Sequence, residues 1–122
     1  MDGALTGALT GSGSHAPAPT WQGAAMIRHV VVFTWSDAAD AGRRAAAVQA
    51  LRGLREDVGG MSSLVVAEDA GLADGNGDAV LIADFPDVEA YQRYAQDPVH
   101  QSVLTEHVRP WLAARAAVQY RI

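Results

Sequence analysis

Apolar residues alternate with other residues in some stretches of the chain and recur at helical spacing in others, and these two periods predict the elements of one domain. The first stretch, residues 26–35, is β-branched and aromatic, a composition typical of a strand. Alternation places Ile27, His29, Val31, Phe33 and Trp35 on one face, and Met26, Arg28, Val30, Val32 and Thr34 on the other. Because both faces carry apolar side chains, we expect both to be at least partly covered.

A helix is predicted next, from a cap at Ser36 or Asp37 to about Asp57, and Gly59-Gly60 ends it. Its apolar stripe at helical spacing comprises Ala41, Ala45, Val48, Leu51, Leu54 or Arg55, and Val58.

Two further strands are predicted at residues 61–68 and 78–85, with a polar loop between them. A short helix capped by Asp87 follows, then a longer helix, and a strand at residues 115–122 closes the chain. This β-α-β-β-α-β order predicts an α+β, ferredoxin-like fold, in which one antiparallel sheet has helices on one side.

The sheet face without helices is expected to need a partner. Its predicted apolar residues are Val30, Val32, Val80 and Ile82. Such a patch is large for a monomer of this size to leave in water, and two-fold dimers are the commonest closed assembly. We therefore expect a homodimer that packs through this face.

A corner within the second helical region carries the main candidate site. Asp97 suits the N-cap of a helix and Pro98 suits its first position. His100 then lies in the first turn, where the helix dipole disfavours a protonated ring, so we predict a neutral imidazole able to act as a general base. Tyr94 ends the preceding helix, and the corner is expected to bring its hydroxyl near His100. A base beside a hydroxyl donor suits proton abstraction next to a carbonyl group.

One broad face of the helix after the corner is predicted to carry His100, Val103, Leu104, His107, Val108, Trp111 and Leu112. Pro110 cannot donate a hydrogen bond to residue 106, so it should kink this helix. His100 and His107 lie about 10 Å apart along a helix that rises 1.5 Å per residue, too far to chelate one ion. We expect no metal site.

Composition narrows the function classes. The chain has 122 residues, a formal net charge of −5 and scattered arginines, which argues against a nucleic-acid-binding surface. It has no cysteine, so disulfides and thiol chemistry are excluded, and no apolar run long enough for a membrane span. Residues 1–25 are rich in Gly, Ala and Pro and are expected to be a flexible extension, with Met26 an alternative start. We expect a cytoplasmic protein that consists of one domain at residues 26–122.

Three stretches together resemble the stress-responsive A/B-barrel (Dabb) domain family: IRHVVVFTW, NGDAVLIADFPDVEAYQRYAQDPVHQSV and RPWLAARAAVQY. The resemblance covers about residues 26–122 and implies a dimeric α/β barrel. Thr34 departs from it, because many members have lysine there.

One family member, plant olivetolic acid cyclase, performs an intramolecular aldol condensation with a tyrosine and a histidine. These match Tyr94 and His100, its first-strand histidine matches His29, and a further pocket histidine matches Ala79 and is therefore missing here. The resemblance implies that His100 and Tyr94 are catalytic and that an apolar small molecule, of the polyketide kind, is the ligand. The predicted substrate-binding residues are His29, Phe33, Leu81, Val103, Leu104 and His107.

Other interpretations stay open. His100 can serve only to order the start of its helix, Tyr94 can bury its ring and leave its hydroxyl in water, and His29 can be a satisfied core residue. The function hypotheses are a cofactor-free polyketide cyclase or aldol-type lyase, a non-catalytic stress-responsive or ligand-binding dimer, and, by fold analogy alone, a monooxygenase.

Overall fold

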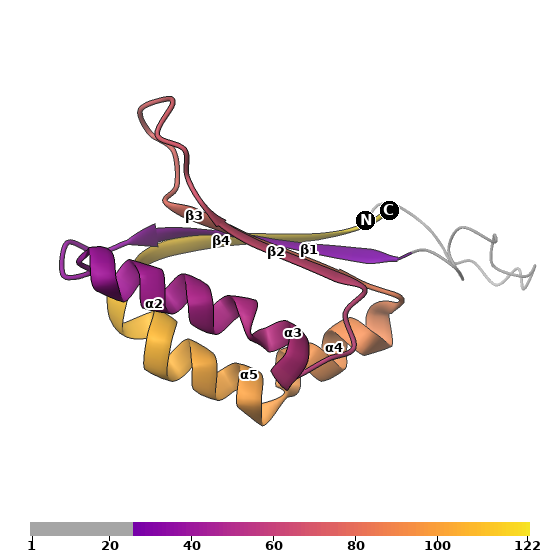
Figure 1. The fold of residues 1–122 in the computed structure, drawn as a ribbon. Coiled ribbons are helices and arrows are strands. Elements are labelled where there is room, and N and C mark those ends of the chain that lie inside the picture. Colours follow the sequence, from indigo (N-terminus) through magenta and orange to yellow (C-terminus); the bar gives the residue numbers. More distant parts are fainter. Residues whose placement is uncertain (1–25) are drawn as a thin grey trace, which may run out of the picture.

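The computed structural model describes residues 26–122, which form a four-stranded antiparallel sheet with all helices on one face (Figure 1). The strands are β1 (Ile27–Trp35), β2 (Ser63–Glu68), β3 (Ala79–Phe85) and β4 (Leu112–Arg121). Their order in the sheet is β2-β3-β1-β4. The ferredoxin-like α+β prediction is confirmed. The predicted extension at residues 1–25 lies outside the described residues.

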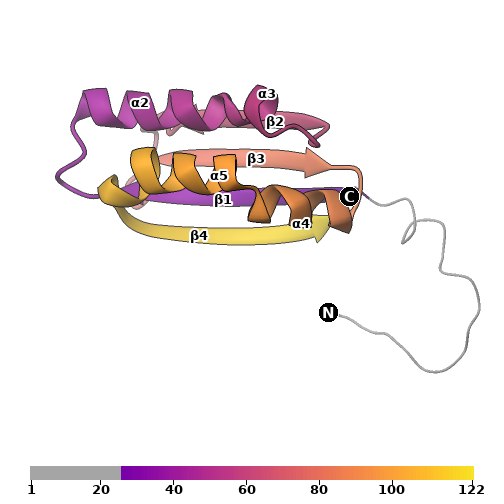
Figure 2. The same cartoon turned by 90° about the horizontal axis from the view of Figure 1, so that it is seen from below.

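The helical layer lies over one side of this sheet. It consists of α2 (Ala41–Arg52), α3 (Leu54–Asp57), α4 (Val88–Gln96) and α5 (Pro98–Val103), followed by a π-helical turn (Leu104–Val108) and a 3-10 turn (Arg109–Trp111). Figure 2 shows β4 at the edge of the sheet beyond α5. None of the helices in this part of the chain is long and apolar enough to cross a membrane.

The predicted alternation in β1 is confirmed by burial, and β3 buries every second residue in the same way. Phe33 in β1 and Phe85 in β3 are buried under the helices, together with the other inward residues of both strands. The core formed there is completed from α2 and α3 by Val48, Leu51 and Leu54. Antiparallel pairing then places His29 opposite Gln119 of β4.

The first helix begins later than predicted. Its N-cap is Asp40, whose side chain accepts a hydrogen bond from the Arg43 N–H, so the predicted cap at Ser36 or Asp37 is wrong. Ser36 instead donates its N–H to the Trp111 carbonyl at 2.7 Å, which extends the pairing of β1 with the chain entering β4.

The buried stripe of α2 also differs from the predicted one. Ala41 and Ala45 are exposed, whereas Ala47 is fully buried beside Val48. Residues 45–47 are all alanine, so hydropathy alone does not identify the inward position.

The corner after α4 forms as predicted, but the helix that follows it changes its winding. Asp97 caps α5, and its carboxylate accepts hydrogen bonds from the N–H groups of Val99 and His100. Arg109 donates its N–H to the Leu104 carbonyl five residues back, which defines the π-helical turn. This irregularity lies directly before Pro110, where the sequence predicted a kink.

The final strand starts at Leu112 rather than at residue 115, because Leu112 pairs with Trp35 across a register shift. Leu112 was predicted on the helix face, and this assignment is wrong.

The face of the sheet without helices carries a row of apolar residues that crosses all four strands. Val65, Ile82, Val30 and Val118 lie side by side in register. Val65 and Val118 are 53% and 59% exposed, so residues 26–122 of one chain do not cover this open face. The predicted apolar patch is therefore present and is wider than the sequence indicated.

Candidate active site

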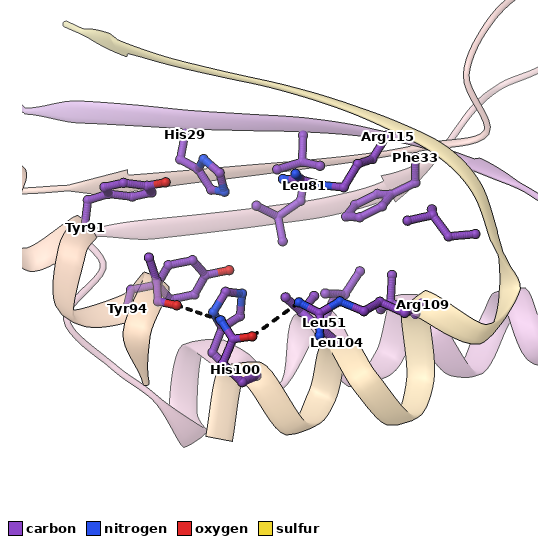
Figure 3. A pocket seen from close by; sticks show the side chains of 15 residues that line it. His29, Phe33, Leu51, Leu81, Tyr91, Tyr94, His100, Leu104, Arg109 and Arg115 are labelled. Carbon is purple, nitrogen blue, oxygen red and sulfur yellow. Dashed lines mark hydrogen bonds between the residues drawn. The ribbon is translucent and has the colours of Figure 1, made fainter. Parts of the chain in front are cut away.

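A cavity of about 320 Å³ lies between the inner face of the sheet and α4, α5 and the π-helical turn (Figure 3). Side chains from β1, β3 and β4 form one wall, and side chains from the helical layer form the other. Its walls are mostly apolar. The apolar residues are Val31, Phe33, Leu51, Leu81, Ala95, Leu104, Val108 and Leu112.

His100 lies in the first turn of α5 and lines this cavity. The residue is only 8% exposed, and its Nδ1 atom has no hydrogen-bond partner among residues 26–122. Burial lowers the pKa of His100, while the backbone carbonyl groups of Tyr94 and Ala95 act in the opposite direction. The predicted neutral imidazole is supported, but the main cause is desolvation rather than the helix dipole.

Tyr94 ends α4 and packs its ring on His100. The two ring centroids lie 4.0 Å apart, with 27° between the ring planes. Tyr94 is 2% exposed, and Figure 3 shows its hydroxyl pointing into the cavity. Burial raises the pKa of Tyr94, so the phenol stays protonated at neutral pH and acts as a hydrogen-bond donor.

His29 enters the same cavity from the sheet. Its Nδ1 lies 2.9 Å from the amide nitrogen of Gln119, which β4 places opposite it. Nδ1 therefore accepts, and the neutral ring carries its proton on Nε2. Burial, with the positive charge of Arg115 as the second cause, lowers the pKa of His29 to about 4. The ring packs against Tyr91 at 5.1 Å and Tyr94 at 6.1 Å, between centroids.

The structure brings most of the predicted site together, with two exceptions. Phe33, Leu81 and Leu104 line the cavity with the two histidines and Tyr94. Val103 does not line it and packs against the core instead. His107 does not line it either, and its side chain is 46% exposed.

The π-helical turn explains the position of His107. At regular α-helical spacing, His107 would lie two turns after His100 on the same face. The wider turn at Leu104–Val108 adds a residue to that path, so that Leu104 and Val108 take the inward positions and His107 faces outward.

Several residues of the site escaped the sequence analysis. Tyr91, Gln101, Arg109 and Arg115 line the cavity, and Gln119 donates a hydrogen bond to His29. Gln101 donates an N–H to the Ala95 carbonyl and accepts one from Arg109, the two dashed bonds of Figure 3. The pairing register of β4 with β1 would have indicated Arg115 and Gln119, since they lie opposite Phe33 and His29. That register depends on where β4 starts, which the sequence placed too late.

Among residues 26–122, the charged residues that line the cavity are all of one sign. Arg109 and Arg115 line it, and no aspartate or glutamate of this range does. In the described part of the chain, no three His, Asp or Glu side chains are grouped so that they could hold a metal ion. The arrangement is a mostly apolar chamber with an unprotonated imidazole, a protonated phenol and cationic groups. Such a set of groups can take a proton from a carbon acid and stabilise the negative charge that develops on oxygen.

Comparisons with known proteins agree with this architecture. The family model of the Stress responsive A/B Barrel Domain matches residues 27–122. A protein of Thermobifida fusca, described as a dimeric ferredoxin-like protein of unknown function, is 29% identical with a TM-score of 0.75, over 81% of this chain and 92% of that one. A Dabb family protein of Mesorhizobium loti with a ferredoxin-like fold is 21% identical with a TM-score of 0.67, over 79% and 95% of the two chains.

A structure with a stated enzymatic activity also shares the fold. A hydroxynitrile lyase from Passiflora edulis is 14% identical with a TM-score of 0.71, over 80% of this chain and 93% of that one. At this identity the likeness concerns the fold alone. A search of curated proteins gave no match.

Proposed function

This chain belongs to the stress-responsive A/B barrel domain family, and we propose that it is a homodimeric, cofactor-free enzyme that removes a proton beside a carbonyl group of an apolar, polyketide-like substrate. The proposal rests mainly on His100, a buried imidazole in the wall of a mostly apolar cavity. Its Nδ1 has no hydrogen-bond partner among residues 26–122, and its ring stacks on Tyr94. A buried base with a lowered pKa beside a donor is typical of catalytic sites.

In the proposed reaction, the His100 imidazole takes the α-proton, and the electron pair of that C–H bond forms the enolate. The enolate oxygen accepts a hydrogen bond from the Tyr94 hydroxyl. The enolate carbon then bonds to a second carbonyl carbon of the same chain, whose π-electron pair moves to its oxygen. That alkoxide takes the proton back from His100, so the net result is an intramolecular aldol addition and the enzyme is unchanged.

The cavity contributes through proximity and desolvation. A volume of about 320 Å³ suits a small, folded chain rather than a large cofactor. When the cavity holds two carbonyl groups of one chain in reactive geometry, the loss of conformational entropy occurs on binding and no longer opposes ring closure. The apolar walls, with Phe33, Leu81 and Leu104 among them, also strengthen each polar contact made inside.

The homodimer is proposed from the open face of the sheet. Its row of Val65, Ile82, Val30 and Val118 is continuous, and the Thermobifida fusca relative is described as dimeric. A second copy packed on this face would remove the apolar row from water.

An assay with a synthetic polyketide mimic tests the proposal. The N-acetylcysteamine thioester of a 3,5,7-trioxoalkanoate, whose C2 enolate can close a six-membered ring on the C7 ketone, would be incubated with the protein, and cyclised products followed by mass spectrometry. We expect His100→Ala to slow cyclisation by roughly 10²–10⁴-fold, the usual contribution of a general base. Tyr94→Phe should slow it by roughly 10²-fold, as for loss of one oxyanion donor.

His107→Ala is the matched control, because His107 follows on the same helical segment but is exposed outside the cavity. Its activity should equal that of the wild type. If wild type and His100→Ala cyclise the thioester equally, the catalytic proposal is wrong. If the wild type binds the thioester but does not cyclise it, a non-catalytic ligand-binding dimer takes its place.

A further inference from the structure

Two arginine side chains of the cavity have no acidic partner among residues 26–122. Within the described part of the chain, the side chain of Arg109 donates hydrogen bonds only to the neutral oxygens of Thr105 and Gln101. Among residues 26–122, no carboxylate lies within 4.0 Å of the guanidinium group of Arg109 or Arg115. Both residues are exposed at the mouth of the cavity while their side chains line it. Figure 3 shows the two side chains reaching inward from opposite walls, one from the sheet and one from the helical layer.

This local charge is opposite to that of the protein as a whole. The chain carries a formal net charge of −5, yet the described residues that line the cavity include two arginines and no acid. The positive charge also acts on the buried groups, beside the larger effect of burial. Arg115 adds to the lowering of the pKa of His29 by burial, and Arg109 adds to that of His100. Arg115 also opposes the rise that burial causes in the pKa of Tyr94. An uncompensated positive potential inside a concave site attracts and orients anions.

We propose that Arg109 and Arg115 form a subsite for the carboxylate group of the substrate. The substrate is then an apolar carboxylic acid that carries its reacting carbonyl groups farther along the chain. This inference rests on the proposed function, because it assigns the substrate class of the same cavity. Guanidinium groups suit the role, since their planar donors match the two oxygens of a carboxylate.

The geometry of the sheet sets the direction in which such a substrate lies. Arg115 is opposite Phe33, and Gln119 is opposite His29. His29 lies four residues before Phe33 in β1. At about 3.3 Å per strand residue, these levels are roughly 13 Å apart. A carboxylate held at the level of Arg115 would leave an apolar chain to run between Phe33 and Leu104 toward Tyr94 and His100. The charged end stays near water, and the reacting carbons lie in the buried part.

Binding of octanoate and octanamide, measured by isothermal titration calorimetry, tests the subsite. The two probes share the apolar chain and differ in the charge of one end. We expect wild type to bind octanoate roughly tenfold more tightly, in line with a charge-assisted hydrogen bond at a partly exposed site. Arg115→Gln should lose most of this preference, and the double variant Arg109→Gln/Arg115→Gln should lose all of it.

Arg121→Gln is the matched control. Arg121 lies on the same strand and the same face as Arg115 but does not line the cavity. It should retain the preference for octanoate. Equal affinity of wild type for both probes, a preference that survives in the double variant, or an equal loss in Arg121→Gln would each overturn the inference.

Octanoate contains no ketone, so its binding does not depend on the base. A preference for octanoate in a protein that fails the cyclisation assay would therefore reject the proposed function and keep the anion subsite. A protein that cyclises neutral thioesters but shows no preference for octanoate would support the proposed function and reject the anion subsite.

Discussion

The two faces of the sheet are built from alternate residues of the same strands, yet they are in different states. In β1, His29 and Phe33 point toward the helices and are 6% and 3% exposed, whereas Val32 points to the open face and is 37% exposed. The inward face is completed within one chain and encloses the cavity. The open face presents an apolar row across four strands, and no other part of residues 26–122 covers it.

This difference in exposure shows that the alternating pattern of one strand can build both a core within the chain and a surface for association. The helix-covered face supplies most of the folding free energy of a single chain, because its side chains leave water when that chain folds. The open face contributes fully only when a second copy covers it. Substitutions on the two faces should therefore change different measured quantities: the free energy of unfolding on the inward face, and the association state on the open face.

The largest expected effect is loss of packing on the inward face. Phe85 is fully buried, and its ring lies 5.1 Å from that of Tyr94, between centroids. Phe85→Ala should lower the free energy of unfolding by about 3–5 kcal/mol, the usual cost of removing a buried aromatic ring. Urea unfolding followed by circular dichroism measures it. Val118→Ala on the open face is the counterpart and should cost much less within one chain; equal losses would remove the distinction between the faces.

A charge on the open face should break the proposed dimer without unfolding the chain. Val118→Glu places a carboxylate in the apolar row, where a second copy would have to bury it unpaired. We expect the wild type to have twice the mass of the 12.8 kDa chain, and the variant to have the mass of a single chain. Light scattering after size-exclusion chromatography measures both. Val88→Glu, on the exposed start of α4, should remain dimeric. A dimeric Val118→Glu would show that the interface lies elsewhere.

A smaller effect concerns the pH dependence of stability on the inward face. The pKa of His29 falls from 6.5 to about 4 on folding, so the unfolded chain binds the proton more readily between these values. The folded state should therefore lose stability as the pH falls from about 6.5 to about 4, and gain nothing further above that window.

His29→Gln should flatten part of this dependence in urea unfolding at several pH values. The lowered pKa of His100 acts in the same direction. His107→Gln, on the exposed side of the π-helical turn, should leave the profile as in wild type. An unchanged profile in His29→Gln would mean that its ring is hydrated in the folded protein.

Local chemistry and simple periods made much of the fold predictable. The alternation of Ile27 to Trp35 identified the inward face because apolar and aromatic residues repeat there with period two. The corner at Asp97 and Pro98 was predictable since capping depends on adjacent residues alone. The pairing of Tyr94 with His100 followed from that corner, together with the family resemblance.

The errors arise where distant segments determine the outcome. The pairing of Leu112 with Trp35 starts β4 early and decides that Arg115 and Gln119 enter the site. The π-helical turn before Pro110 moves His107 out of the cavity, although Pro110 itself signalled an irregularity. Neither outcome follows from hydropathy, because each depends on backbone pairing between residues far apart or on a change in helix winding.

The central claim is that His100 acts as a base in the cavity, and exchange of an α-proton tests it most directly. A β-diketone such as nonane-2,4-dione in D₂O would be followed by proton NMR, which reports only the first chemical step and needs no knowledge of the product. We predict that the wild type accelerates deuterium incorporation above the buffer rate and that His100→Ala, folded by circular dichroism, returns it to that rate, while His107→Ala exchanges like wild type. Exchange at the buffer rate with wild type, or equal acceleration by His100→Ala, would contradict the account.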